Sequence, residues 1–305
     1  MSAGAGEAPA SRARIVIAFL VVTAIWGSTW LVIKDQVGSV PASWSITYRF
    51  LVACVGMFVL ALLRRDPLRL PREGMVLSML VGLAQFVGNF QFVYQAEIHL
   101  TSGLVAVFYA LLMVPNAILA RIFLQQRVAP GFVVGSLVAM SGIALLLVHE
   151  YRSAPPEGRI VLGVALTCAG LLSASVANVL QAGRVARGLA VVPLIAWSML
   201  WGTLIDIVWS LATAGPPVIE TRWEYLAGIL YLAIMGSVVT FPLYFMLIRQ
   251  LGPGRAAYNG VAVPVVAMAL STLFEGYRWT TLAVAGAVLA MAGLVIALSA
   301  RRKAA

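Results

Sequence analysis

Polar and aromatic side chains recur at helical spacing inside an apolar stretch of this sequence. Gln85, Asn89, Phe92 and Gln95 follow one another at intervals of four, three and three residues. Side chains three or four residues apart share one face of an α-helix. Amide side chains can bind the ammonium and carboxylate groups of a small metabolite, or they can bond to a neighbouring helix. The stripe therefore predicts a face that meets a substrate or a second helix.

Five other apolar segments carry comparable faces, and their convergence favours a shared polar interior open to water. They hold Thr23, Trp26, Gly27, Trp30 and Lys34; Tyr109 and Asn116; Ser175, Asn178 and Gln181; Ser237, Thr240 and Tyr244; and Tyr258 with Asn259. The aromatic rings would enclose a side chain, and the amides would bind amino and carboxylate groups. From these faces we select as substrate-binding candidates Trp26, Trp30, Asn89, Tyr109, Asn116, Asn178, Tyr244, Tyr258 and Asn259.

Four ionisable residues lie within or beside the apolar segments. Arg49 lies one to two turns inside its segment, where it either meets a substrate carboxylate or extends to the outer membrane interface; we include it among the substrate-binding candidates. Asp206 is either a proton site or a partner for another helix. Glu97 and His99 are interpreted as solvated residues of an outer turn.

The composition requires lipid as the surrounding solvent. Of 305 residues, 62% are hydrophobic and 10% are charged, and the mean hydropathy is +0.97. A spanning helix needs about 20 apolar residues. Ten such segments can be marked: 15–34, 43–63, 74–96, 100–122, 130–149, 159–182, 190–213, 225–248, 253–274 and 279–300. The predicted fold class is therefore an all-α integral membrane protein.

Several functional classes are disfavoured. The net charge of +10 comes from basic residues scattered between apolar runs, so no nucleic-acid partner is expected. No phosphate-binding loop and no His/Cys cluster with metal spacing occurs, so we expect no nucleotide engine, cofactor or metal. Cys54 and Cys168 are interpreted as buried thiols. No constellation of His, Asp, Glu or Cys gathers at one membrane face, which argues against an enzyme.

Charge distribution predicts the orientation of the chain. With the N-terminus inside, fifteen of the 21 Lys and Arg residues fall in inner loops or helix ends and five in outer ones. This bias favours both termini in the cytoplasm of a multi-pass protein of the cell inner membrane.

A long repeat divides the chain into halves. Leu100–Leu147 recurs as Leu251–Leu298 at an offset of 151 residues, and Gly103, Gly135 and Gly142 all meet glycines. With five helices in each half, the second half crosses the membrane in the opposite sense, as in many secondary transporters. Pro115 and Pro264 are expected to bend the fourth and ninth helices. The predicted domains are a disordered tail, 1–13; two five-helix repeats, 14–152 and 159–300; and a basic tail, 301–305.

The order of several short motifs resembles the EamA family of the drug/metabolite transporter superfamily. They are Ala24–Ser28 (AIWGS), Arg49-Phe50, Leu100–Ala106 with Pro115, Leu251–Ala257 with Pro264, and Phe274–Gly276. The resemblance implies inverted five-helix halves around a central cavity, and within the family it is similar to YddG-type exporters of aromatic and other neutral amino acids. Two departures are Gln125-Gln126-Arg127, where the first repeat often has Gly-Glu, and Ala177-Asn178 in place of a second Trp-Gly.

Three hypotheses follow. The leading one is an inner-membrane secondary transporter that exports amino acids by alternating access. The second is a related transporter of another small metabolite or drug, and the third, from another class, is a membrane-integral enzyme or structural subunit. The oligomeric state, the transport direction and any coupling ion are left open, and a monomer is compatible with the sequence.

Overall fold

Ten helical spans run across the molecule. The computed structural model describes residues 12–38, 40–125, 127–153, 159–251 and 259–303. Seven of the spans are single helices: α1 (Arg12–Gln36), α2 (Ala42–Leu63), α7 (Pro130–Ser153), α8 (Ile160–Ala182), α10 (Val191–Ala214), α14 (Asn259–Phe274) and α15 (Thr281–Lys303). The single-turn α9 (Arg184–Arg187) joins α8 to α10. The part of the chain that is described has no β-strand beyond one isolated bridge.

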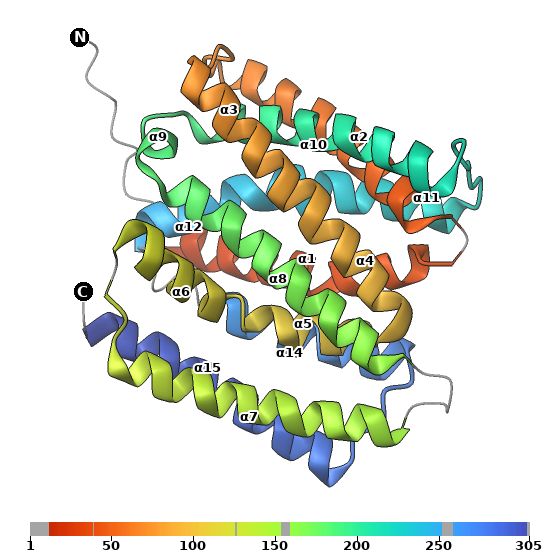
Figure 1. The fold of residues 1–305 in the computed structure, drawn as a ribbon, viewed down its shortest axis with the longest axis vertical. Coiled ribbons are helices and arrows are strands. Elements are labelled where there is room, and N and C mark those ends of the chain that lie inside the picture. Colours follow the sequence, from red (N-terminus) through yellow and green to blue (C-terminus); the bar gives the residue numbers. More distant parts are fainter. Residues whose placement is uncertain (1–11, 39, 126, 154–158, 252–258, 304–305) are drawn as a thin grey trace.

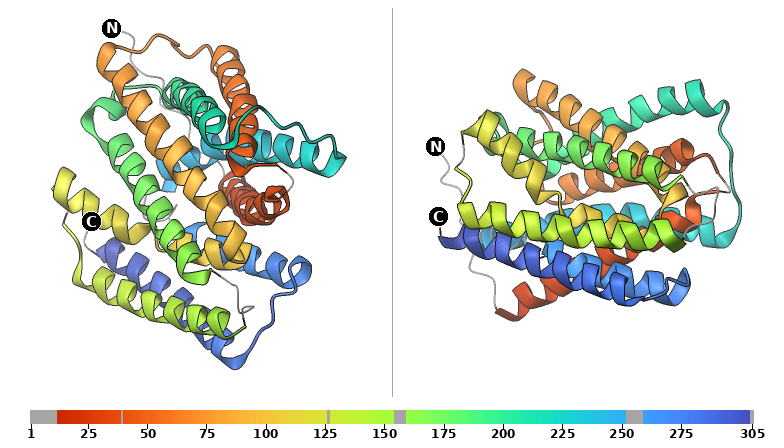
Figure 2. Two further views of the ribbon diagram at one scale, coloured as in Figure 1. Left: turned by 45° about the vertical axis from the view of Figure 1, so that its right-hand side comes forward. Right: turned by 60° about the horizontal axis from the view of Figure 1, so that its bottom comes forward.

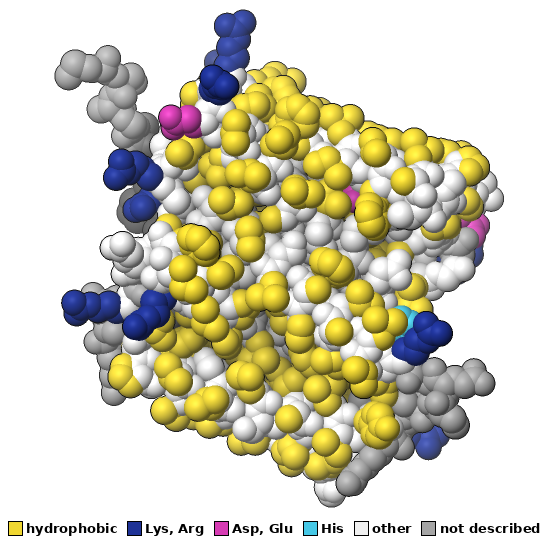
Figure 3. Space-filling model, viewed as in Figure 1, with side chains coloured by type: hydrophobic (Ala, Val, Ile, Leu, Met, Phe, Trp, Pro, Cys, Tyr) yellow, Lys and Arg dark blue, Asp and Glu magenta, His cyan; other side chains and the backbone are white. Residues whose placement is uncertain are grey.

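The outer flank of this bundle is apolar, as a lipid environment requires. Among the described residues, eight spans are long and apolar enough to cross a membrane, and Asn259–Phe274 and Thr281–Ala297 are shorter apolar helices. Large side chains on this flank, such as Val161, Val208 and Leu273, are 75%, 67% and 74% exposed. On the face in Figure 3, hydrophobic side chains cover the flank, and Lys and Arg gather at its two ends. The prediction of an all-α membrane protein is confirmed.

The start of α1 and the end of α15 lie at one end of the bundle (Figure 1, and the right view of Figure 2). We call this the terminal end, and the opposite end the distal end. Helices α1, α4 and α14 finish at the distal end, and α2 and α5 begin there.

The third and eighth spans are interrupted at equivalent places by π-helical turns. The third consists of α3 (Arg72–Val81), η1 (Gly82–Asn89) and α4 (Phe90–His99). The eighth consists of α11 (Trp223–Leu230), η2 (Tyr231–Val239) and α12 (Thr240–Leu251). The two π segments lie about 150 residues apart, close to the repeat offset. Such segments are uncommon and often accompany functional sites.

The fourth span breaks into α5 (Ser102–Ala110) and α6 (Met113–Leu124). The break precedes Pro115, whose ring nitrogen cannot donate to the carbonyl of Leu111. Instead, the Val114 amide donates to that carbonyl at 2.8 Å, which tightens the turn. Pro264, in contrast, lies inside an uninterrupted α14. The predicted interruption is therefore confirmed for the fourth span, while Pro264 does not divide its helix.

Contacts between spans follow one pattern in both halves. Helix α2 packs along α10, and α7 packs along α15. Helix α1 packs against η2 and α12, while its counterpart α8 packs against η1 and α4. Helices at equivalent positions in the two halves therefore have equivalent partners, and each partner lies in the opposite half.

Helices α7 and α15 approach closely because glycines face one another. A Cβ on Gly142 would meet the backbone of Gly286 and Ala290, and one on Gly135 would meet that of Gly293 and Ala297. Rising numbers on α7 pair with falling numbers on α15, so the two helices run antiparallel. These are the glycines of the sequence repeat.

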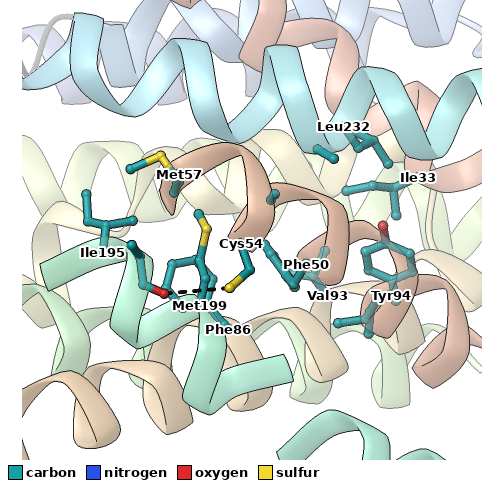
Figure 4. Packing of buried hydrophobic residues seen from close by; sticks show 14 of the residues in the cluster. Ile33, Phe50, Cys54, Met57, Phe86, Val93, Tyr94, Ile195, Met199 and Leu232 are labelled. Carbon is teal, nitrogen blue, oxygen red and sulfur yellow. Dashed lines mark hydrogen bonds between the residues drawn. The ribbon is translucent and has the colours of Figure 1, made fainter. Parts of the chain in front are cut away.

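The largest buried cluster joins α2 and α10 to the third and eighth spans. Phe50 and Met57 of α2 belong to it together with Met199 of α10 and Leu232 of η2, and all four are fully buried (Figure 4). The thiol of Cys54 lies in this cluster, 3.8 Å from the carbonyl oxygen of Ala196. Both Cys54 and Cys168 are free thiols, although Cys168 is exposed.

Candidate functional site

One face of α1 touches a different element at almost every turn. The amide of Asn259, on α14, donates to Thr23 Oγ1 at 2.8 Å. One turn on, the indole of Trp26 donates to Thr240 Oγ1 at 2.9 Å, at the end of η2. Gly27 then lets α1 approach the side chain of Val266 on α14. The predicted stripe on the first helix is thus the surface around which core helices of both halves are arranged.

A second cluster joins α1, the third span and the fourth span. The rings of Trp30 and Tyr109 lie 5.0 Å apart. The Tyr109 hydroxyl, on α5, donates a hydrogen bond to Asn89 Oδ1, on η1, at 2.6 Å. Gly170 on α8 makes room for that hydroxyl, since a Cβ there would lie 2.5 Å from it. Three sequence-predicted candidates therefore meet at one point.

A third contact joins the fourth and sixth spans nearer the terminal end. The Asn178 amide donates to Asn116 Oδ1 at 3.3 Å, and both residues are half-buried. Asn116 lies one residue after Pro115, so the break between α5 and α6 sets its position.

Trp26 anchors an aromatic group on the eighth span. Its ring lies 5.0 Å from that of Tyr244 and 6.0 Å from that of Phe241. Tyr258 lies outside the described residues. Of the ten predicted site residues, the structure therefore describes nine. Hydrogen bonds or ring contacts join seven of these to one another, and Asn259 bonds instead to Thr23.

Arg49 is buried, with 3% of its surface exposed, so it does not extend to the membrane interface. Its guanidinium carbon lies 4.6 Å from the centre of the Phe90 ring and 5.1 Å from that of Phe50. Aromatic faces attract such a cation. Its Nε and Nη1 atoms have no hydrogen-bond partner within the described chain.

Other polar atoms of the candidate residues are also left unpaired. Trp30 Nε1 is a buried donor, and Asn259 Oδ1 is a buried acceptor, without a partner in the described residues. Unpaired buried polar groups are rare because each costs roughly 1–3 kcal/mol. They are the groups that a polar ligand would satisfy.

The structure shows the environment of two acidic residues, Asp206 and Glu97. The sequence left two roles open for Asp206 and indicated a solvated position for Glu97. Asp206 is fully buried, and its Oδ1 accepts from Gln91 on α4 at 2.9 Å, so it pairs with another helix. Glu97, expected to be solvated, is 0% exposed, which corrects that interpretation. Lys34, at the end of α1, donates to the backbone oxygen of Glu97, and the charge of Glu275, just beyond the end of α14, acts on its carboxyl group.

The described residues contain no group of three or more His, Cys, Asp or Glu side chains that could hold a metal ion. The site is instead made of indole, phenol, amide and guanidinium groups.

The described chain is an all-α bundle of ten spans whose interior contains polar and aromatic side chains. The sequence model of the EamA-like transporter family matches residues 13–148 and again 161–299. The chain belongs to this family, and the family name indicates a transporter rather than an enzyme.

Curated relatives are distant but match along most of their length. PagO of Salmonella typhimurium is 23% identical over 290 residues, covering 95% of this chain and 94% of the relative. A probable amino-acid metabolite efflux pump of Escherichia coli K12 is 26% identical over 295 residues, covering 94% and 95%. The uncharacterized inner membrane transporter YedA of E. coli K12 is 28% identical over 264 residues, covering 83% and 80%.

One solved crystal structure shares the fold. It aligns with a TM-score of 0.68 at 19% identity, covering 97% of this chain and 100% of the other.

Proposed function

We propose that this protein is a secondary transporter of the cell inner membrane that exports amino acids, aromatic and other neutral ones, by alternating access. The observation that carries the proposal is the set of unpaired buried polar atoms beside aromatic rings. Arg49 and Trp30 offer N–H donors, and Asn259 offers an oxygen acceptor. A zwitterionic amino acid presents the complementary groups, a carboxylate and an ammonium.

The aromatic residues would select the side chain of the substrate. Trp30 and Tyr109 are half-buried and tilted toward one another, as are Trp26 and Tyr244. Aromatic pairs favour tilted or offset contacts, so a flat or apolar substrate side chain fits against such faces. The relative named as a probable amino-acid metabolite efflux pump supports the same substrate class.

The two halves of the fourth span support alternating access. In α5, at the distal end, eight of nine residues are buried. In α6, toward the terminal end, two of twelve are buried. This contrast supports a conformation whose pathway is closed at the distal end. With the termini in the cytoplasm, such a conformation would face inward, and the repeats 14–152 and 159–300 would exchange roles when it reverses.

Counterflow in proteoliposomes tests the proposal directly. Purified protein is reconstituted with an excess of unlabelled amino acid inside, and uptake of labelled amino acid is followed for a panel that includes aromatic, aliphatic, acidic and basic members. We expect transient accumulation of aromatic and neutral members. Empty liposomes and an Asn89→Leu variant serve as controls. If purines, sugars or cationic drugs accumulate instead, the substrate class is one of these and not amino acids. If no amino acid shows counterflow, the proposed function is rejected.

A further inference from the structure

The distal end of the molecule is closed by ionisable residues that come from different helices. Lys34, at the end of α1, donates its amine to the backbone oxygens of Glu97 and, at 2.9 Å, Leu100. The Glu275 carboxylate, beyond the end of α14, accepts from the Ser102 amide at 3.2 Å and from its hydroxyl at 2.5 Å. The cation thus caps the end of α4 and the anion caps the start of α5, where helix dipoles favour them.

Glu97 lies among these groups, but none of them pairs with its carboxyl group. It is fully buried, and neither of its carboxyl oxygens has a hydrogen-bond partner within the described chain. Five charged or titratable groups are close enough to interact electrostatically with its carboxyl group. They are Lys34 from α1, Arg49 from α2, Tyr94 on its own helix, Tyr109 from α5, and Glu275. No ion pair involving Glu97 occurs among the described residues.

A buried carboxylate without a donor is too costly to persist, and the inexpensive alternative is the neutral acid. The two nearby cations do not remove this cost, because neither forms an ion pair with the Glu97 carboxyl group among the described residues. Lys34 is held by backbone carbonyls, and Arg49 is held between the rings of Phe50 and Phe90. In the closed arrangement, the physical chemistry of Glu97 therefore favours the protonated form.

We propose that Glu97 is a proton-binding site of the distal gate, protonated when this end is closed and ionised when it opens to water. On opening, the O–H bond of Glu97 breaks, the proton passes to water on the distal side, and the carboxylate remains beside Lys34. A proton bound in the closed form and lost in the open form makes closing depend on the distal pH. Acid on this side closes the gate, and alkali opens it. The inference rests on the alternating access of the proposed function.

Thiol labelling tests this inference without a substrate. Leu100, which is 2% exposed beside Glu97 and Lys34, is changed to Cys in a Cys54→Ala, Cys168→Ala background. Its reaction with a membrane-impermeant thiol reagent is measured from the distal side across pH. The reactivity of a thiol itself rises with pH, so each rate is divided by that of Ile219→Cys, in the 77% exposed loop position between α10 and α11.

The expected result is a rate ratio that rises with pH, by up to roughly tenfold per pH unit where one proton controls the equilibrium. In Glu97→Gln, which is permanently neutral, the ratio should stay low at every pH. A flat ratio in the chain that retains Glu97 overturns the inference, even if the Gln variant fails to fold. So does an unchanged pH dependence in a folded Glu97→Gln protein.

An infrared measurement gives a second readout on the chain with its natural Glu97. The carbonyl stretch of a protonated buried carboxyl should be present at neutral pH and absent from Glu97→Gln; identical spectra would contradict a bound proton. The outcome is separable from the counterflow assay. If labelling depends on pH but no amino acid is transported, the proposed substrate is rejected and the proton-binding role of Glu97 is retained. If amino acids show counterflow but labelling does not depend on pH, the substrate is retained and the role of Glu97 is rejected.

Discussion

The hydroxyl of Tyr109 donates a 2.6 Å hydrogen bond to the side-chain oxygen of Asn89, the last residue of the π-helical segment η1. This bond ties the third span to the fourth at the point where the third span returns to α-helical geometry. Asn89 is 3% exposed, so water does not readily replace a lost donor. The bond thus fixes both the position of a candidate substrate-binding amide and the end of an unusual helical segment.

Tyr109→Phe should destabilise the protein by about 1–3 kcal/mol, because it leaves a buried acceptor without a donor. Unfolding in detergent measures the change. Tyr48→Phe is the matched control, since its hydroxyl bonds to the Val218 carbonyl at an exposed site and its loss should change stability little. If the two substitutions change the free energy of unfolding equally, the hydrogen bond to Asn89 stabilises the protein no more than an exposed one does.

Gly170→Ala should break the same bond from the opposite side. The added Cβ would lie 2.5 Å from the Tyr109 hydroxyl and force it away. In a Tyr109→Phe background that oxygen is absent, so the alanine should be tolerated far better. A double-mutant cycle should therefore give a coupling of roughly 0.5–3 kcal/mol. Additive effects would place the cost of the alanine elsewhere, for example against Phe92.

Gly142→Val should separate α7 from α15. Its side chain would meet backbone atoms of Ala290 and Gly286, which cannot rotate away as a side chain can. Overpacking of this kind costs about 1–3 kcal/mol or more. Gly260→Ala is the control, because a Cβ there meets nothing within 4 Å. Thermal stability in detergent should fall for the first and hold or rise for the second; a stable Gly142→Val protein would contradict the close approach.

Arg49→Met should fold, since a flexible apolar side chain suits the space between two phenylalanine rings. If Arg49 binds the substrate carboxylate, the variant loses about 1.5–3 kcal/mol of binding, or roughly ten- to hundredfold in affinity. The loss should appear for tryptophan and not for tryptamine, which has no carboxylate. Competition in the counterflow assay measures both, and Arg222→Met, at an exposed ion pair with Asp35, is the control. A parallel loss for both ligands would assign Arg49 to packing.

Hydropathy was sufficient to predict the ten spans, because lipid imposes a length and a composition on each of them. Helical spacing was sufficient to predict which polar faces turn inward: Asn89 meets Tyr109, and Asn116 meets Asn178. Those contacts are also the interhelical bonds that the sequence allowed as an alternative. Sequence spacing cannot separate the two roles, since a bond between helices and a bond to a ligand need the same side chains.

The π segments had no sequence signal, because they differ from an α-helix only in which carbonyl each amide reaches. The burial of Glu97 could not be predicted for another reason. It depends on how the end of α1 meets the end of α4, and that contact joins residues 63 positions apart. Apolar periodicity describes one helix at a time, so it does not show which helix ends cover which.

The glycine-mediated pairing of α7 with α15 also bears on biosynthesis. Helix α7 ends at Ser153, and its partner α15 begins at Thr281. Until α15 has been synthesised, α7 must wait in the bilayer with its glycine face in contact with lipid or an insertion factor. The pairing of α7 with α15 is therefore among the last contacts between the two halves to form.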